Sequence, residues 1–158
     1  SKGTVFSFEL HLPIGDEKNL VSKSASIKKD AFVGTSVLLV EDNEMNRFIA
    51  AQSLAFIGCE IIEAENGKVA VDLLQQRSFD LILMDIQMPV MDGYTAARLI
   101  RTLPGAYYAQ LPILALTANA IPEQVQLCLE AGMNDCVTKP LEIEVLLDKI
   151  RLLVNKNK

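Results

Sequence analysis

The chain has 158 residues, half of them hydrophobic, and a formal net charge of −5 at pH 7. This length suits one ordinary domain plus a short extra segment, and the apolar content allows a sizeable core. The acidic balance argues against a nucleic-acid surface, which needs a clustered basic face, and no apolar run approaches the roughly 18 residues of a membrane helix.

The N-terminal part divides into a strand-like segment and a polar segment. Residues 4–12, TVFSFELHL, alternate apolar and polar positions in the manner of a strand. Residues 15–30 are polar, rich in Lys and Ser, and without a sustained period. We therefore expect three parts: a segment at 1–14, a linker at 15–34 and the main domain at 35–155.

Apolar runs and helical patterns alternate from residue 36 onward. Strands are predicted at 36–40, 59–64, 79–84, 112–117 and 134–138. Helices are predicted at 44–57, 68–77, 94–103, 122–131 and 142–154. The apolar positions at helical spacing in the first helix are Met45, Phe48, Ile49, Leu54 and Ile57.

The alternation of strands and helices predicts an α/β fold. Continuous apolar strands such as SVLLV and LILM suit a parallel sheet that is covered on both faces. Such strand–helix units predict a flavodoxin-like, doubly wound, five-stranded parallel sheet in the order 2-1-3-4-5, with helices on both faces. Ligands of these sheets bind beyond the carboxyl ends of the strands.

Polar residues follow four of the predicted strands at that edge. Glu41 and Asp42 follow the first strand, Asp85 ends the third, Thr117 ends the fourth, and Lys139 follows the fifth. Converging carboxylates repel one another, and a divalent cation such as Mg²⁺ relieves this repulsion. Next to a cation, a hydroxyl and an ammonium group, Asp85 is a candidate nucleophile toward phosphorus that forms an aspartyl-phosphate.

Each of these residues alone has a simpler interpretation. An acidic pair after a strand often begins a helix, a Thr at a strand end often caps one, and Lys-Pro marks a turn. It is their combination, each at the end of its strand, that indicates a site. The single histidine, His11, and three scattered cysteines do not indicate a zinc site, and the cysteines are expected to be reduced thiols.

Four motifs in this order resemble the receiver domain of two-component response regulators: VLLVEDNEMNR, LILMDIQMPVMDG, ILALTA and GMNDCVTKP. The resemblance covers residues 35–155 and implies that Asp85 is the phosphoacceptor. It implies that Asp42 binds Mg²⁺ directly and Glu41 through water. The main-chain carbonyl of Gln87 would complete the protein's share of the metal shell.

The same resemblance assigns roles on the phosphoryl side. Thr117 and Lys139 would contact the phosphoryl oxygens, and the Lys139–Pro140 peptide is expected to be cis. The side chains of Gln87 and Asn119 would tune the loss of the phosphoryl group to water. The domain would therefore catalyse its own phosphorylation and dephosphorylation, although the chain lacks the parts that a kinase needs.

Receivers pair the threonine with an aromatic switch residue three positions before the lysine, where this chain has Cys136. A small thiol cannot fill or vacate the space of a ring. The departure predicts a weaker conformational readout of phosphorylation, or one that the helix at 122–131 carries alone.

The segment SKGTVFSFELHLP is similar to the last strand of the ATP-binding domain of histidine kinases. The chain is therefore expected to be the cytoplasmic, C-terminal part of a hybrid sensor histidine kinase. Its expected partners are the phospho-donor domain of that kinase and a histidine phosphotransfer protein, with no nucleic acid and no membrane contact. Output would occur by phosphotransfer or contact.

Two other functions remain open on the sequence alone. One is an aspartate-nucleophile hydrolase of the haloacid-dehalogenase type, but this class has a second Asp where the chain has Gln87. The other is a non-catalytic docking module that keeps the fold without the chemistry, although all five key positions at the strand ends are filled.

Overall fold

The computed structural model describes residues 31–119 and 121–155. Their strands are β1 (Ser36–Val40), β2 (Glu60–Ala64), β3 (Leu81–Asp85), β4 (Ile113–Thr117) and β5 (Asp135–Thr138). Their helices are α1 (Glu44–Phe56), α2 (Gly67–Leu74), α3 (Gly93–Thr102), α4 (Ala106–Gln110), α5 (Pro122–Glu130) and α6 (Ile143–Asn155). In this part of the chain, no helix has both the length and the apolar character to cross a bilayer.

The strands form one parallel sheet in the order β2-β1-β3-β4-β5, which confirms the predicted topology. Val40 at the end of β1 lies opposite Met84 of β3, and Asp85 lies opposite Leu116 of β4. The next strand continues this alignment, with Thr117 opposite Thr138. The carboxyl ends of four strands therefore meet at one edge of the sheet, where Asp85 and Thr117 are placed.

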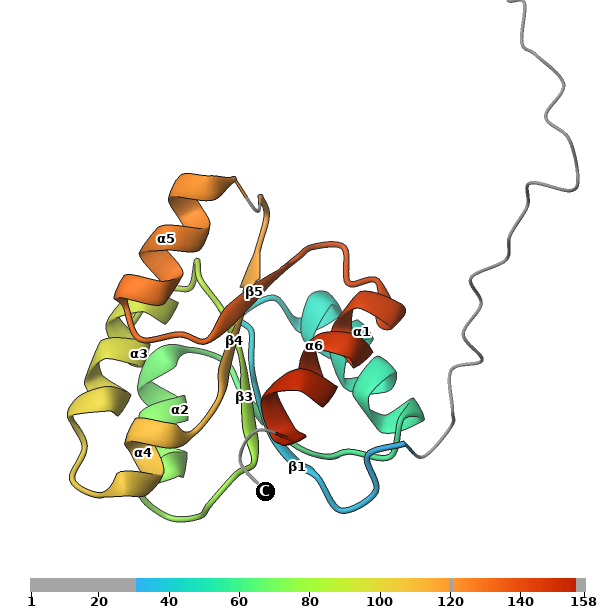
Figure 1. Ribbon diagram of the computed structural model, residues 1–158, viewed down its shortest axis with the longest axis horizontal. Helices are drawn as coiled ribbons and strands as arrows, with labels where there is room; N and C mark the ends of the chain where they lie inside the picture. Colours follow the sequence, from blue (N-terminus) through green and yellow to red (C-terminus); the bar gives the residue numbers. More distant parts are fainter. Residues whose placement is uncertain (1–30, 120, 156–158) are drawn as a thin grey trace, which may run out of the picture.

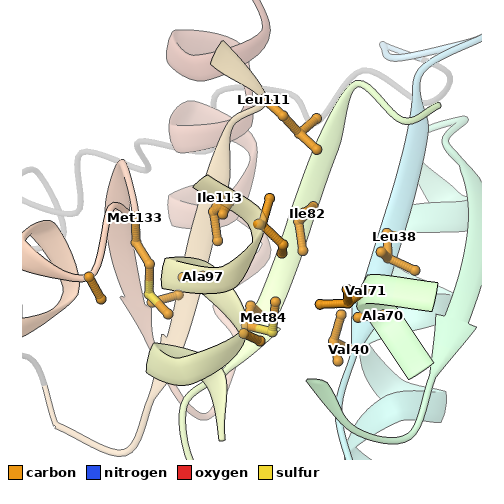
Figure 2. Close-up of a cluster of buried hydrophobic side chains, with 14 of the residues drawn as sticks. Leu38, Val40, Ala70, Val71, Ile82, Met84, Ala97, Leu111, Ile113 and Met133 are labelled. Atoms are coloured by element: carbon orange, nitrogen blue, oxygen red, sulfur yellow. The ribbon is translucent and has the colours of Figure 1, made fainter. Parts of the chain in front are cut away.

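Helices cover both faces of the sheet (Figure 1). Alternate residues of each strand point to opposite faces, so that Leu38 packs toward α2 and α3 whereas Leu39 packs toward α1 and α6. Figure 2 shows the first of these two cores, in which Val71 of α2 and Ala97 of α3 contact the central strands. The strand residues 81–85 are all buried, as expected for a central strand.

The first helix forms as predicted, but its apolar positions divide between two faces. Leu54 and Ile57 are buried, whereas Met45, Phe48 and Ile49 are 66%, 59% and 51% exposed. At 100° per residue the exposed group lies about half a turn around the helix from the buried group. Helical spacing alone does not distinguish one wide apolar face from two opposite stripes.

Helix α4 was missed from the sequence. It has five residues, too few for a recognisable period, and its position depends on two tyrosines. The Tyr107 hydroxyl accepts a hydrogen bond from Phe79 N (2.7 Å) and donates one to Phe79 O (3.1 Å). The Tyr108 hydroxyl donates to Leu74 O (3.1 Å). Contacts between distant segments hold this short helix in place, and local propensity does not reveal them.

The folded unit begins before residue 35, inside the segment predicted as a linker. Residues 31–34 form a turn, and Phe32 is buried in the core beneath α1 and α6. Phe32 N donates to Ile57 O (2.8 Å), and Thr35 N donates to Phe32 O (3.0 Å). The predicted strand at 4–12, the segment 1–14 and the rest of the linker lie outside the described residues.

Candidate functional site

A single crevice at the carboxyl edge of the sheet collects the residues predicted for phosphoryl and metal contact. These are Glu41, Asp42, Asp85, Gln87, Thr117, Asn119 and Lys139. Two other predicted residues lie elsewhere: Pro140 borders a neighbouring hollow beside α1, and Cys136 belongs to the core under α5. The chemistry-bearing residues thus converge, and the predicted switch position lies apart from them.

Three carboxylates form the acidic side of the crevice. Glu41, Asp42 and Asp85 each place one oxygen so that all three oxygens lie within 4.8 Å of one another. Glu41 and Asp85 are only 1% and 6% exposed, whereas Asp42 is open to solvent. Oxygen ligands at such separations, with one side open to water, fit a hard divalent cation such as Mg²⁺.

Lys139 provides the positive charge of the crevice. Its Nζ lies 2.6 Å from Glu41 Oε2 and 2.7 Å from Asp85 Oδ2. Burial opposes the charge, but hydrogen bonds to Asp85 and Glu41 outweigh it and raise the pKa of Lys139 above its ordinary value. The lysine is therefore protonated at neutral pH. The peptide bond from Lys139 to Pro140 is cis.

Thr117 and Asn119 form a small hydrogen-bonded turn after β4. The buried Thr117 hydroxyl donates to Asn119 O (2.8 Å) and accepts from Asn119 N (3.2 Å). A contact between this hydroxyl and a phosphoryl group on Asp85 would exchange the bond that it donates to Asn119.

Backbone N–H groups of the loop after Asp85 make the hydrogen bonds that hold its conformation. Gln87 N donates to Asp85 Oδ1 (3.2 Å), which leaves Oδ2 to face Lys139. Val90 has a φ of 68°, unusual for a β-branched residue, and Met91 N donates across it to Pro89 O (2.7 Å). Strained turns of this kind persist where the surrounding structure determines them, often beside functional sites.

Gly93 allows α3 to start directly against the backbone at the end of β3. Its N donates to Ile86 O (2.9 Å). A Cβ at this position would collide with the carbonyl oxygen of Asp85 and lie 3.0 Å from Ile86 Cα. The Asp92 side chain caps the same helix by accepting from Thr95 N (2.8 Å). The Asp-Gly pair thus turns the chain into α3, and the glycine is needed for the close approach of the two backbones.

Sequence reasoning missed two residues of the first turn of α1. The Asn46 amide lines the crevice and donates to Glu41 Oε1 (3.1 Å). Arg47 Nη1 donates to Glu41 O (2.8 Å). Both residues stand within the quoted motif VLLVEDNEMNR, but only its two acidic residues carried an expectation. The available signal was their distance in sequence from Glu41. Asn46 and Arg47 follow Glu41 by five and six residues, which places them in the first turn of α1, next to the end of β1.

Cys136 occupies the core rather than the crevice. Cys136 of β5 lies opposite Ala115 of β4 and is 6% exposed. It packs in the hydrophobic cluster that includes Cys128 of α5. Burial and the Asp135 charge raise the pKa of its thiol. Burial and the Asp80 charge likewise raise the pKa of Cys59 to about 11. All three cysteines are buried free thiols, protonated at neutral pH and therefore poor nucleophiles.

Comparison with known proteins agrees with this geometry. Residues 37–151 match the family model of the response regulator receiver domain. Hybrid signal transduction histidine kinase M of Dictyostelium discoideum is 44% identical over 121 residues, which is 75% of this chain and 5% of that protein. Sensor histidine kinase RcsC of Escherichia coli (strain K12) is 35% identical over 76% of this chain and 12% of its own length. The chain therefore spans only a small part of these curated relatives.

Two solved structures share the fold of the chain. One is the receiver domain of sensor histidine kinase PA1611 from Pseudomonas aeruginosa PAO1, with a magnesium ion coordinated in its active site cleft. It is 36% identical with a TM-score of 0.71, over 78% of this chain and 99% of that one. The other is the receiver domain of Ssk1 in complex with the phosphotransfer protein Ypd1 from Saccharomyces cerevisiae. It is 31% identical with a TM-score of 0.70, over 78% of this chain and 90% of that one.

Proposed function

The chain belongs to the response regulator receiver domain family, and we propose that it takes a phosphoryl group from a phosphohistidine onto Asp85. The observation that carries this assignment is the position of Asp85. It shares one crevice with the carboxylates of Glu41 and Asp42, whose oxygens lie within 4.8 Å of its own, and with Lys139 at 2.7 Å. A nucleophile, a cation site and a fixed ammonium group thus converge on one point.

The residues of the crevice divide the work of phosphoryl transfer. Glu41, Asp42, Asp85 and the main-chain carbonyl of Gln87 would hold Mg²⁺, which when bound supplies neutralisation of the phosphoryl charge. A carboxylate oxygen of Asp85 attacks phosphorus in line with the bond from phosphorus to the imidazole nitrogen of the donor. That bond breaks, the imidazole keeps its electron pair, and Asp85 becomes an acyl phosphate.

Lys139 and Thr117 serve the phosphoryl oxygens. The ammonium group of Lys139, already 2.7 Å from Asp85 Oδ2, is placed to pair with a phosphoryl oxygen. The Thr117 hydroxyl reaches the same group after giving up its bond to Asn119 O. Gln87 and Asn119 line the crevice beside Asp85, and their side chains would set the lifetime of the acyl phosphate.

Phosphorylation is expected to depend on Mg²⁺. With acetyl phosphate as donor, removing the metal with EDTA should slow uptake by about 100-fold or more, because charge neutralisation by a metal contributes several kcal/mol. Mass spectrometry of the intact protein measures the uptake. Excess Mg²⁺ should restore it, and circular dichroism should show an unchanged fold in EDTA. Rapid metal-independent uptake would contradict the proposed mechanism.

We propose that Cys136 weakens the readout of this event. A thiol that is already packed beside Cys128 and other core residues has no ring to move when Thr117 changes partners. The hydrogen-bonded turn formed by Thr117 and Asn119 is then the main route by which the site affects the surface.

We further propose that the chain is the C-terminal, cytoplasmic part of a longer hybrid sensor histidine kinase. Hybrid kinases among the curated relatives support this origin. On this proposal residues 1–14 end the kinase's ATP-binding domain, and the segment from residue 15 toward the start of the receiver links the two. The phospho-donor domain of the kinase and a histidine phosphotransfer protein are the proposed partners.

The exposed stripe of α1, formed by Met45, Phe48 and Ile49, is the proposed docking surface for the phosphotransfer protein. A partner that delivers a histidine to Asp85 must cover the rim of the crevice. Ile49 lines a hollow with Lys139 beside that rim, and the same stripe continues along the first turns of α1. The Ssk1 receiver domain, which was crystallised with Ypd1, supports a protein of this kind as the occupant.

Replacing Phe48 by Glu should weaken phosphotransfer to or from such a partner by about 10-fold or more, because an apolar anchor becomes a charge at the interface. The rate of phosphotransfer is measured with a phosphotransfer protein of the source organism that exchanges phosphoryl groups with the wild type. Each rate is normalised to the same variant's uptake from acetyl phosphate. Leu152→Glu is the matched control, since Leu152 is 62% exposed on α6. An equal loss in both variants would exclude α1 as the specific docking surface.

A further inference from the structure

We propose that Arg47 is a positioning residue for the cation site. This proposal rests on the proposed function of the crevice. Arg47 holds the loop between β1 and α1, and with it Glu41 and Asp42, in the geometry that receives a divalent cation. It does not touch the reacting atoms. Its guanidinium acts on the main chain of the two residues whose carboxylates are expected to serve the metal.

The contacts of Arg47 connect three elements of the fold. Nη1 donates to Glu41 O (2.8 Å) and, at a longer distance, to Asp42 O (3.3 Å). Nε donates to Glu63 Oε2 on β2 (3.1 Å). The backbone of Arg47 is fixed in α1, where its N donates to Asn43 O (2.9 Å). One side chain thus ties two successive carbonyls of the loop to α1 and β2.

Two neighbouring residues of α1 hold Glu41 from both ends. Asn46 binds its side chain through Oε1 (3.1 Å), and Arg47 binds its main-chain carbonyl (2.8 Å). The Glu41 N donates to Ala64 O on β2 (3.1 Å). Charge-assisted bonds from guanidinium to carbonyl are stronger than neutral ones, and the Arg47 side chain is only 19% exposed. The position of Glu41 is therefore determined by its neighbours.

The ion pair with Glu63 alone does not explain the arrangement. Glu63 has a half-exposed side chain, and exposed ion pairs contribute little to stability. The pair instead fixes the direction of the guanidinium, so that Nη1 faces the loop. Residues that orient metal ligands in this way typically change metal affinity by about 10- to 100-fold when they are replaced.

Positioning and simple electrostatics predict opposite results when Arg47 is removed. A cation near three carboxylates repels Mg²⁺, so losing its charge alone would tighten metal binding. Losing its hold on the loop would weaken binding, because the carboxylates then sample other geometries. The sign of the change in Mg²⁺ affinity therefore separates the two roles.

The test compares Mg²⁺ binding to Arg47→Met, Arg47→Lys and wild type by calorimetric titration. Arg47→Met is expected to bind about 10-fold more weakly. Arg47→Lys keeps the charge but lacks the planar guanidinium group with its several N–H donors. It should therefore also bind Mg²⁺ more weakly than wild type. Arg151→Met is the control, because Arg151 makes a more exposed ion pair with Asp148 within α6 (3.2 Å). Unchanged or tighter binding by Arg47→Met would overturn the proposal.

A second readout needs no metal. In metal-free protein, ¹⁵N relaxation should show lower order parameters at Asp42 and Asn43 in Arg47→Met than in wild type, with the β1 and β3 amides unchanged. If Arg47→Met does not fold, the same comparison with Arg47→Lys decides, and unaltered order in the loop counts against the role. Neither readout involves phosphorylation. A failure of Asp85 to accept a phosphoryl group would therefore contradict the proposed function without contradicting the role of Arg47.

Discussion

An Asp85→Asn variant is expected to take up no measurable phosphoryl group from acetyl phosphate or from a phosphohistidine protein. The amide that replaces the carboxylate is not a nucleophile and cannot form an acyl phosphate. Loss of a covalent nucleophile lowers rates by far more than loss of a neighbouring group, so the remaining rate should be below about one hundredth of wild type. Intact-protein mass spectrometry after incubation with donor and Mg²⁺ measures it.

An Asp42→Asn variant is the matched control for Asp85→Asn. Both changes remove one negative charge from the same three-carboxylate cluster and leave the side-chain shape nearly unchanged. Asp42 is exposed and binds no phosphoryl group covalently in the proposed mechanism. Its replacement should weaken Mg²⁺ binding and slow uptake, but high Mg²⁺ should restore part of the rate.

Two results would contradict the assignment of Asp85. One is an Asp85→Asn protein that still incorporates the phosphoryl group at the rate of wild type. The other is a phosphorylated wild type whose label survives hydroxylamine, which cleaves acyl phosphates but not phosphate esters of Ser or Thr. The first outcome would move the reaction to another residue, and the second would exclude the proposed chemistry at any carboxylate.

The parts of the fold that were predictable are those that repeat. Buried strands such as 36–40 and 81–85 are continuous apolar runs, and each is followed by a helix of ordinary length. Once the topology follows from this alternation, the strand ends identify the edge at which Asp85 and Thr117 lie. Element boundaries differ from the predicted ones by no more than three residues.

The unpredicted parts depend on contacts between distant segments. Helix α4 is held by tyrosine hydroxyls that reach Phe79 and Leu74, and nothing local to it signals a helix. The role of Arg47 depends on β2, which supplies Glu63. The burial of Leu54 and the exposure of Phe48 depend on which face of α1 meets the sheet. Composition and period carry no information about such pairings.

A Gly93→Ala variant is expected to destabilise the domain by about 3 kcal/mol, at the upper end of what overpacking usually costs. The added methyl group would occupy the space of the Asp85 carbonyl oxygen and press on Ile86 Cα at 3.0 Å. Both are backbone atoms of a central strand and its continuation, which cannot move without disturbing the sheet. This cost exceeds the gain of up to about 1 kcal/mol that alanine brings to a helix.

Urea denaturation of Gly93→Ala measures that loss, with two variants for comparison. At Gly67 a Cβ would lie 2.8 Å from Ala96 Cβ and 2.8 Å from Met91 O, so Gly67→Ala should cost less. Arg98→Ala, an exposed change on α3, should shift the free energy of unfolding by less than about 0.5 kcal/mol. A Gly93→Ala protein as stable as Arg98→Ala would contradict the close approach of α3 to Asp85.

The same substitution should also slow phosphorylation beyond its effect on stability. Gly93 N is hydrogen-bonded to Ile86 O, so displacing α3 moves the residue directly after Asp85, the proposed nucleophile. An error of about 1 Å in the placement of a reacting group can cost roughly 100-fold in rate. Uptake from acetyl phosphate, measured at a temperature where Gly93→Ala remains folded, should therefore fall, whereas Gly67→Ala, whose clash lies against Met91 and Ala96, should be affected less.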